Sequence, residues 1–168
     1  NTLSKYAELL SKHFKLVKLQ DITEISSGIK LSSEDILDQE TKSNFSDSQA
    51  WIRISDLDRG VINHQGLFCI PPQNLSKRRQ LAENDLLFSR SGTIGKIALV
   101  RAQDEGGIPS PNLYLLRITE EALDPKFLTA YLRSKACQEW FENYSHGTTI
   151  QTITRDTIGQ LPIPIPPK

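Results

Sequence analysis

The chain has 168 residues, with 20 basic and 20 acidic side chains, 38% apolar residues and two cysteines. A soluble chain of this length buries about two-thirds of its unfolded surface, which supports one core, and neutral charge with an ordinary apolar share excludes the disordered class. No apolar run reaches the roughly 20 residues of a membrane helix, and the N-terminal region lacks the pattern of a signal peptide. We therefore expect one globular domain over residues 1–168, a cytoplasmic location and no membrane contact.

Charge is unevenly distributed along this neutral chain. Residues 31–50 carry one basic and five acidic side chains, a net charge of −4, whereas residues 51–101 carry eight basic and four acidic ones, a net charge of +4. A neutral total argues against a protein that is held on nucleic acid by bulk charge alone. The basic segment can still form a local basic surface.

The first half of the chain predicts a short helix, several strands and a long loop. Apolar side chains recur every four residues from Tyr6 to Phe14 and indicate an amphipathic helix. Residues 29–50 are polar and acidic without an apolar period, which predicts a long loop. Short β-type runs occur at residues 16–19, 22–25 and 51–54.

The second half predicts the β core and a long helix. Asp124 followed by Pro125 is a favourable helix start, and apolar side chains then repeat every four residues, so we expect one long helix near residues 125–144. The Pro-rich segment 161–167 predicts an extended tail or an edge strand. Buried strands are expected at residues 86–89, 97–100 and 113–118. The fold class is therefore α/β (α+β), with a mixed, strand-rich core and an N-terminal helix.

Catalytic patterns are absent from the sequence. The segment Gly92–Lys96 resembles a phosphate loop, but its glycines are too close together and Ile97 stands where a magnesium-binding Ser or Thr would be. The three histidines have no metal-ligand spacing, and two cysteines are too few for a disulfide framework or a Cys-rich zinc site. We predict no catalytic residue, no metal and no cofactor.

Polar segments favour a role in recognition instead. Residues 89–96 combine two cations, three hydroxyls and two glycines, a composition suited to phosphate oxygens, although a plain hairpin loop with solvated charges is the alternative. Residues 77–79 form a basic run that is normally a solvated face. Residues 145–152 are rich in hydrogen-bonding groups, and Gln with Thr can read adenine edges and thymine methyl groups, although the segment can also be a helix-capping turn.

Four segments in order carry a family resemblance. They are residues 16–28 (LVKLQDITEISSG), 51–57 (WIRISDL), 84–100 (NDLLFSRSGTIGKIALV) and 147–167 (GTTIQTITRDTIGQLPIPIPP). Together they resemble the target-recognition domain of the DNA specificity subunits of type I restriction-modification systems, which also occurs fused to adenine methyltransferases. The resemblance implies a non-catalytic α/β domain whose loops enter the major groove beside a methyltransferase that flips the target adenine.

The resemblance also implies partners and a parent protein. Double-stranded DNA, methyltransferase (modification) subunits and, through them, a restriction subunit are the expected partners. A full specificity subunit has two such domains joined by long helices, whereas this chain has one and stops at Lys168, where the first long helix would begin. It also lacks methionine. We therefore expect a piece of a specificity subunit or of a fused methyltransferase.

Candidate DNA-binding residues follow from position. The Gly-rich turn that matches the family motif supplies the first backbone contacts, and the basic segment supplies more. Base reading is expected from the loops at residues 29–50 and 59–66, the second of which contains Arg59, and from the 145–152 segment. The candidates are Arg90, Ser91, Thr93 and Lys96 on the turn; Arg53, Lys77, Arg78 and Arg79 for phosphate; and His146, Thr148 and Gln151 for bases. The rival function is a protein-interaction module that uses the Pro-rich tail and the acidic loop 31–50, and an enzyme is the least supported reading.

Overall fold

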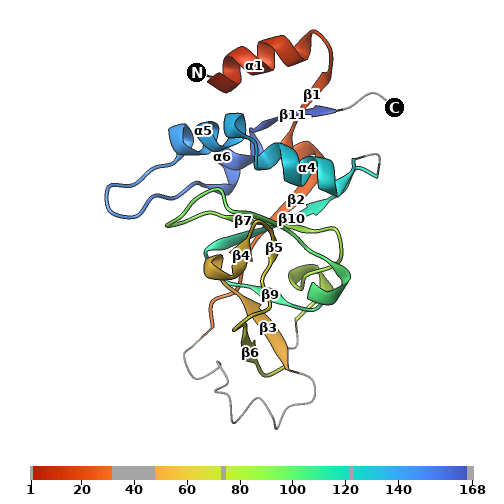
Figure 1. The fold of residues 1–168 in the computed structure, drawn as a ribbon, viewed down its shortest axis with the longest axis vertical. Helices are drawn as coiled ribbons and strands as arrows, with labels where there is room; N and C mark the ends of the chain where they lie inside the picture. The colour runs from red at the N-terminus through yellow and green to blue at the C-terminus, as the bar shows by residue number, and fades with distance from the viewer. Residues whose placement is uncertain (1, 32–47, 73–74, 122, 166–168) are drawn as a thin grey trace.

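The computed structural model describes residues 2–31, 48–72, 75–121 and 123–165, and its elements follow one another along a long axis (Figure 1). Helix α1 (Thr2–Ser11) lies at one end, next to a two-stranded sheet of β1 (Lys15–Lys18) and β11 (Pro162–Ile165). A layer of helices, a six-stranded sheet and a three-stranded sheet follow in that order toward the other end.

The six-stranded sheet is the centre of the fold. Its order is β2 (Thr23–Ser27), β10 (Leu113–Ile118), β7 (Leu86–Ser89), β8 (Ile97–Leu99), β5 (Gly60–Ile62) and β4 (Leu57–Asp58). All neighbours are antiparallel except β5 and β8, which are parallel. The prediction of three buried strands at residues 86–89, 97–100 and 113–118 is confirmed to within a residue.

The three-stranded sheet has the order β6 (Phe68–Ile70), β3 (Gln49–Ile52) and β9 (Ile108–Pro109). The strand predicted at residues 51–54 therefore begins and ends two residues earlier. It ends because the Arg53 backbone N–H donates to the Asp56 carboxylate at 2.8 Å, which starts the 3-10 turn η2 (Ile54–Asp56).

Two hydrophobic cores lie on opposite faces of the central sheet. Successive side chains of a strand point to opposite faces, and in β7 Leu86 and Phe88 enter the core beneath the helices while Leu87 enters the core toward the three-stranded sheet. All three are fully buried. A strand buried on both faces reads as a continuous apolar run, which is why the sequence predicted it well.

The helix expected near 125–144 is two helices, so that prediction is wrong in its continuity. Helix α4 (Pro125–Leu132) begins at Asp124, whose carboxylate accepts the Lys126 N–H at 2.8 Å as the sequence predicted. Helix α5 (Lys135–Tyr144) begins anew because the Ser134 hydroxyl accepts the Cys137 N–H at 3.4 Å. A serine cap inside an apolar repeat interrupts a helix without disturbing its period.

Shorter elements complete the architecture. Helix α5 ends at Tyr144, with Ser145 as its C-cap residue. The other short helices are α2 (Leu19–Ile22), α6 (Arg155–Gly159), η3 (Lys77–Arg79) and η4 (Ala102–Asp104). No helix in the described ranges is long and apolar enough to cross a membrane.

The Pro-rich tail forms an edge strand, as predicted. Strand β11 pairs antiparallel with β1, with Lys15 opposite Ile165 and Lys18 opposite Pro162. Proline has no N–H to donate, so a strand with alternating prolines can pair along one edge only. Residues 166–168 of the tail lie outside the described part of the chain.

Candidate nucleic-acid interface

The turn between β7 and β8, residues 90–96, is closed by a buried serine. The Ser89 hydroxyl donates to the Thr93 carbonyl at 2.5 Å and accepts the Lys96 N–H at 2.8 Å. Gly92 and Gly95 have φ angles of 74° and 85°, which only glycine adopts without strain. Ser89 therefore holds the turn together, while Thr93 stays exposed at its surface.

Arg90 is oriented by an aromatic ring. Its guanidinium lies 5.0 Å from the centroid of the buried Tyr114 ring, and its Nε is buried without a hydrogen-bond partner in the described structure. Burial raises the pKa of Tyr114, and the positive charge of Arg90 partly offsets this rise. Stacking thus positions the Arg90 charge at the base of the turn, where none of the described carboxylates pairs with it.

The turn docks against the loop that follows helix α5, residues 145–152. The Gly92 N–H donates to the Gln151 carbonyl at 3.0 Å, and the Thr152 hydroxyl donates to the Arg90 carbonyl at 3.2 Å. Ser91 and Thr152 also form an isolated antiparallel bridge. The structure therefore brings together two segments that lie some 50 positions apart in the sequence and that the sequence singled out separately.

The 145–152 loop is closed on itself. His146 and Thr152 exchange backbone hydrogen bonds of 2.8 and 2.7 Å. The Gln151 amide donates to the Gly147 carbonyl at 2.5 Å and accepts the Ser145 hydroxyl at 3.1 Å. Gln151 must therefore exchange these two contacts to read a base, whereas the exposed side chains of His146 and Thr148 need no such exchange.

Ile150 at the tip of this loop was not predicted as a site residue. The residue is 64% exposed, the highest value among the large apolar residues of the described chain. An apolar side chain presented by a polar loop can contact a thymine methyl group. The signal in the sequence was a single isoleucine between threonine and glutamine, which is also typical of a strand.

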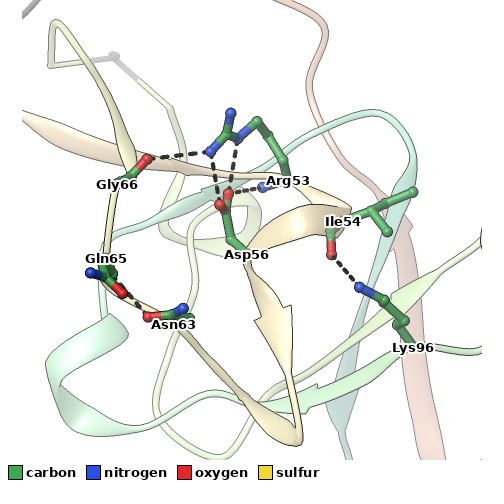
Figure 2. A network of polar contacts seen from close by, with 7 residues as sticks. All are labelled: Arg53, Ile54, Asp56, Asn63, Gln65, Gly66 and Lys96. Carbon is green, nitrogen blue, oxygen red and sulfur yellow. Dashed lines mark hydrogen bonds and ion pairs between the residues drawn. The ribbon is translucent and has the colours of Figure 1, made fainter.

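Arg53 has a partner within the fold (Figure 2). Its guanidinium donates to the Asp56 carboxylate through Nε at 3.1 Å and Nη2 at 2.8 Å, and it also reaches the Gly66 carbonyl at 3.3 Å. It lies 3.8 Å from the centroid of the Phe68 ring. A bidentate pair with a nearly buried carboxylate neutralises this charge, so the structure gives Arg53 a role in holding β3, η2 and the 59–66 loop together.

The same arrangement recurs at three other places in the described part of the chain. Each is an aspartate that accepts the backbone N–H of the third residue before it, and two of them also bind an arginine side chain. Asp21 accepts from the Lys18 N–H. Asp85 accepts from the Ala82 N–H and pairs with Arg117, and Asp104 accepts from the Arg101 N–H and pairs with the Arg101 side chain. The net charge of +4 over residues 51–101 therefore includes arginines that are already paired.

The basic run at 77–79 lies away from the turn. Arg78 forms an ion pair with Glu24, and its carbonyl accepts from Arg117, which stands at the far end of β10. The near end of β10 pairs Leu113 with Ser89, where the turn begins. Four residues of strand separate the two ends by roughly 13 Å, so the structure does not group Lys77, Arg78 and Arg79 with the turn.

Lys96 and Arg59 lie at a second surface beside the turn. The Lys96 ammonium lies 3.5 Å from the Ile54 carbonyl and 3.4 Å from the Leu57 carbonyl, and the first of these contacts is drawn in Figure 2. Arg59 is exposed in the tight connection between β4 and β5, with a φ of 48°. Both line a cleft of about 350 Å³.

Of the other two candidate base-reading loops, the 59–66 loop is described throughout and the 29–50 loop only in part. In the 59–66 loop, His64 pairs with the buried carboxylate of Asp104, and the Gln65 N–H donates to the Asn63 side chain at 3.0 Å. The contact between His64 and Asp104 holds the loop against η4. Residues 32–47 of the 29–50 loop, which include most of the acidic segment, lie outside the described residues.

Comparison with known families identifies the fold. Residues 11–168 match the sequence model for the type I restriction modification DNA specificity domain. The chain belongs to this family. The prediction of a DNA target-recognition domain in a restriction-modification system is thereby confirmed. Members of this family are the DNA-recognition components of such systems and have no catalytic role of their own.

Solved structures share the fold of this DNA specificity domain. The S subunit of a type I restriction-modification system from M. genitalium is 19% identical, with a TM-score of 0.59 over 90% of this chain and 34% of that one. The HsdS subunit from Thermoanaerobacter tengcongensis is 17% identical, with a TM-score of 0.66 over 99% of this chain and 39% of that one. The chain thus spans between a third and two-fifths of these subunits.

A third solved structure with this fold is a restriction endonuclease and not a specificity subunit. The type IIG restriction endonuclease BpuSI is 12% identical, with a TM-score of 0.66 over 98% of this chain and 26% of that one. A comparison with curated protein sequences gave no match. At these identities the structural matches establish the mixed α/β fold predicted from the sequence.

Proposed function

We propose that this DNA specificity domain reads the target sequence of a type I restriction-modification system and directs methyltransferase subunits, and through them a restriction subunit, to that site. Residues 1–168 act as one recognition domain of a longer protein. Double-stranded DNA is the ligand, so the domain acts in the cytoplasm, where that DNA is located.

The docking of the 90–96 turn on the 145–152 loop is the observation that carries this proposal. The turn supplies Arg90 and exposed hydrogen-bonding groups for the DNA backbone, and the loop supplies His146, Thr148 and Ile150 for base edges. Backbone contacts fix the position of a protein on DNA, and base contacts specify the sequence. Two surfaces of these kinds, joined by direct hydrogen bonds, can therefore read bases at a fixed register.

A protein-interaction module remains the rival function, and no comparison favours it. The Pro-rich tail that would serve such a partner is engaged along one edge by β1 up to Ile165. The acidic loop that would serve it falls largely in residues 32–47, outside the described chain.

Methylome sequencing with and without the gene identifies the target sequence, and titration of duplex DNA into the complex with its methyltransferase partner then tests the proposal. We expect tighter binding to the target duplex than to a scrambled one. Thr148→Ala should reduce binding to the target duplex by about 5- to 150-fold, the cost of one base contact, and leave binding to the scrambled duplex unchanged. Equal affinity of the unaltered complex for both duplexes would refute sequence reading.

A further inference from the structure

The cleft beside the turn is formed by three segments that meet at the edge of the central sheet. The connection from Asp58 to Gly60 forms one wall, Lys96 at the start of β8 forms another, and the α4–α5 junction contributes Arg133 and Gln138. Strands β5 and β8 pair in parallel here, with Gly60 opposite Ala98. The lining is mostly polar, which does not suit an apolar ligand.

The Arg133 side chain packs closely on Gly60. A Cβ atom at residue 60 would lie 2.7 Å from Arg133 Nη1, so the guanidinium lies directly on the Gly60 backbone. Arg133 is also the residue at which α4 ends, just before the Ser134 cap. The interruption of the helix therefore fixes where this side chain enters the cleft.

The cleft concentrates positive charge that the fold does not neutralise. Arg59, Lys96 and Arg133 line it together with one carboxylate, Asp58, which leaves a formal net charge of +2. Within the described residues none of the three cations forms an ion pair, whereas Arg53 and Arg117 each bind a nearly buried aspartate. Three like charges around one cleft repel each other, and a bound anion removes that repulsion.

The cleft is connected directly to the proposed reading surface. The Gln138 amide donates to the Gly95 carbonyl at 2.9 Å and to the Leu132 carbonyl at 3.0 Å, which joins the turn to the end of α4. The turn is itself hydrogen-bonded to the 145–152 loop through the Gly92 N–H. An anion in the cleft is thus held at a fixed position relative to the loop that faces the bases.

We propose that this cleft binds one backbone phosphate of the DNA, with Arg133 and Arg59 as its principal ligands and Lys96 as a third cation. The proposal rests on the proposed function, because the phosphate comes from the DNA that the domain reads. Arg133 was not among the residues that the sequence predicted. It sets the register of the duplex, since a phosphate fixed here determines which base pairs reach the 145–152 loop.

The test uses the complex with its methyltransferase partner and duplexes of target and scrambled sequence at 50 and 200 mM salt. Losing one phosphate contact lowers the exponent of the salt dependence by about 0.9. Arg133→Gln should therefore reduce the ratio of the dissociation constant at 200 mM salt to that at 50 mM salt by roughly 3.5-fold. The reduction should be the same on both duplexes. Lys126→Gln is the matched control, because Lys126 is an exposed cation at the start of the same helix.

A second measurement pairs the side chain with its phosphate. Neutral methylphosphonate groups replace the phosphates of the target duplex one at a time. At one position the replacement should weaken DNA binding by the unaltered complex but not by the Arg133→Gln or Arg59→Gln complex. If every substituted duplex weakens the variants as much as the unaltered complex, or if Arg133→Gln and Lys126→Gln behave alike, the cleft does not bind phosphate. Absence of DNA binding by the unaltered complex would instead refute the proposed function itself.

Discussion

The ion pair between Arg117 and Asp85 permits a quantitative prediction about the central sheet. Asp85 is 2% exposed, and its carboxylate accepts from Arg117 through Nε at 2.9 Å and Nη2 at 2.6 Å, and from the Ala82 N–H at 2.8 Å. Arg117 also donates to the Gln80 carbonyl at 2.9 Å. The hydrogen bonds to Asp85 raise the pKa of Arg117, so the guanidinium keeps its charge.

Arg117→Met removes the guanidinium and leaves the Asp85 carboxylate buried with one backbone donor. Removal of one partner of a buried pair costs about 3–5 kcal/mol, against a total stability of about 5–15 kcal/mol for a domain. The side chain of Arg117 is 27% exposed, which favours the lower end of that range. For a chain of this size the loss corresponds to a fall in Tm of about 6–20 °C.

Urea unfolding of the variants measures this loss. Arg79→Met is the control, since Arg79 is exposed and should change the free energy of unfolding by less than about 0.5 kcal/mol. In the Asp85→Asn background, which keeps an acceptor for Ala82 but removes the charge, Arg117→Met should cost about 2 kcal/mol less than in the unaltered chain. A cost below about 1 kcal/mol for Arg117→Met alone would show that the pair behaves as an exposed one and would refute the reasoning.

Two further predictions concern the loop and the buried thiol. Gly147 has a φ of 130°, and a Cβ atom there would lie 2.1 Å from the Ile150 carbonyl oxygen. Gly147→Ala should therefore weaken binding to the target duplex at least tenfold while the urea midpoint stays nearly constant. Gly106→Ala is the control, because Gly106 has a φ of 78°, no atom within 4 Å of such a Cβ and a position outside the candidate reading loops; equal binding by both variants would contradict a role for the 145–152 loop. Burial raises the pKa of the Cys137 thiol to about 11 from 9.0. The unfolded chain therefore ionises first, and a stabilisation of up to roughly 3 kcal/mol, present below pH 9, is lost as the pH rises from 9 to 11. Urea unfolding at pH 8 and pH 10.5 should show a larger loss in the unaltered chain than in Cys137→Ala, in which only other groups such as the buried Tyr114 lower the stability at high pH. An equal loss in both would contradict it.

Local patterns predicted the parts of the fold that local physics determines. The strand at 86–89 and the helix start at Asp124 were found because continuous burial and an Asp-Pro cap have direct sequence signals. The break at Ser134 was missed because a serine leaves the apolar period intact. Pairing of Thr152 with Ser91 could not be foreseen, since it depends on how α5 packs on the sheet.

Candidate site residues divided in a similar way. The composition of the 90–96 turn and the 145–152 loop identified both as surfaces for recognition, but not that they adjoin. Counting charges could not tell a paired arginine such as Arg53 from Arg59, which has no ion pair among the described residues, because pairing depends on the position of a carboxylate in space. Arg133 carried no signal at all, since a single arginine within a helical repeat is typical of a solvated face.

The antiparallel pairing of β1 with β11 has an evolutionary consequence. Lys15 and Ile165 stand opposite each other, so β1 begins and β11 ends at points whose Cα atoms are about 4.5–5.5 Å apart. Whatever precedes and follows this stem can keep its geometry while the intervening segment is replaced as a unit by another that closes with the same two strands. A new target sequence can then be acquired in one recombination event, without passing through intermediates that read no sequence.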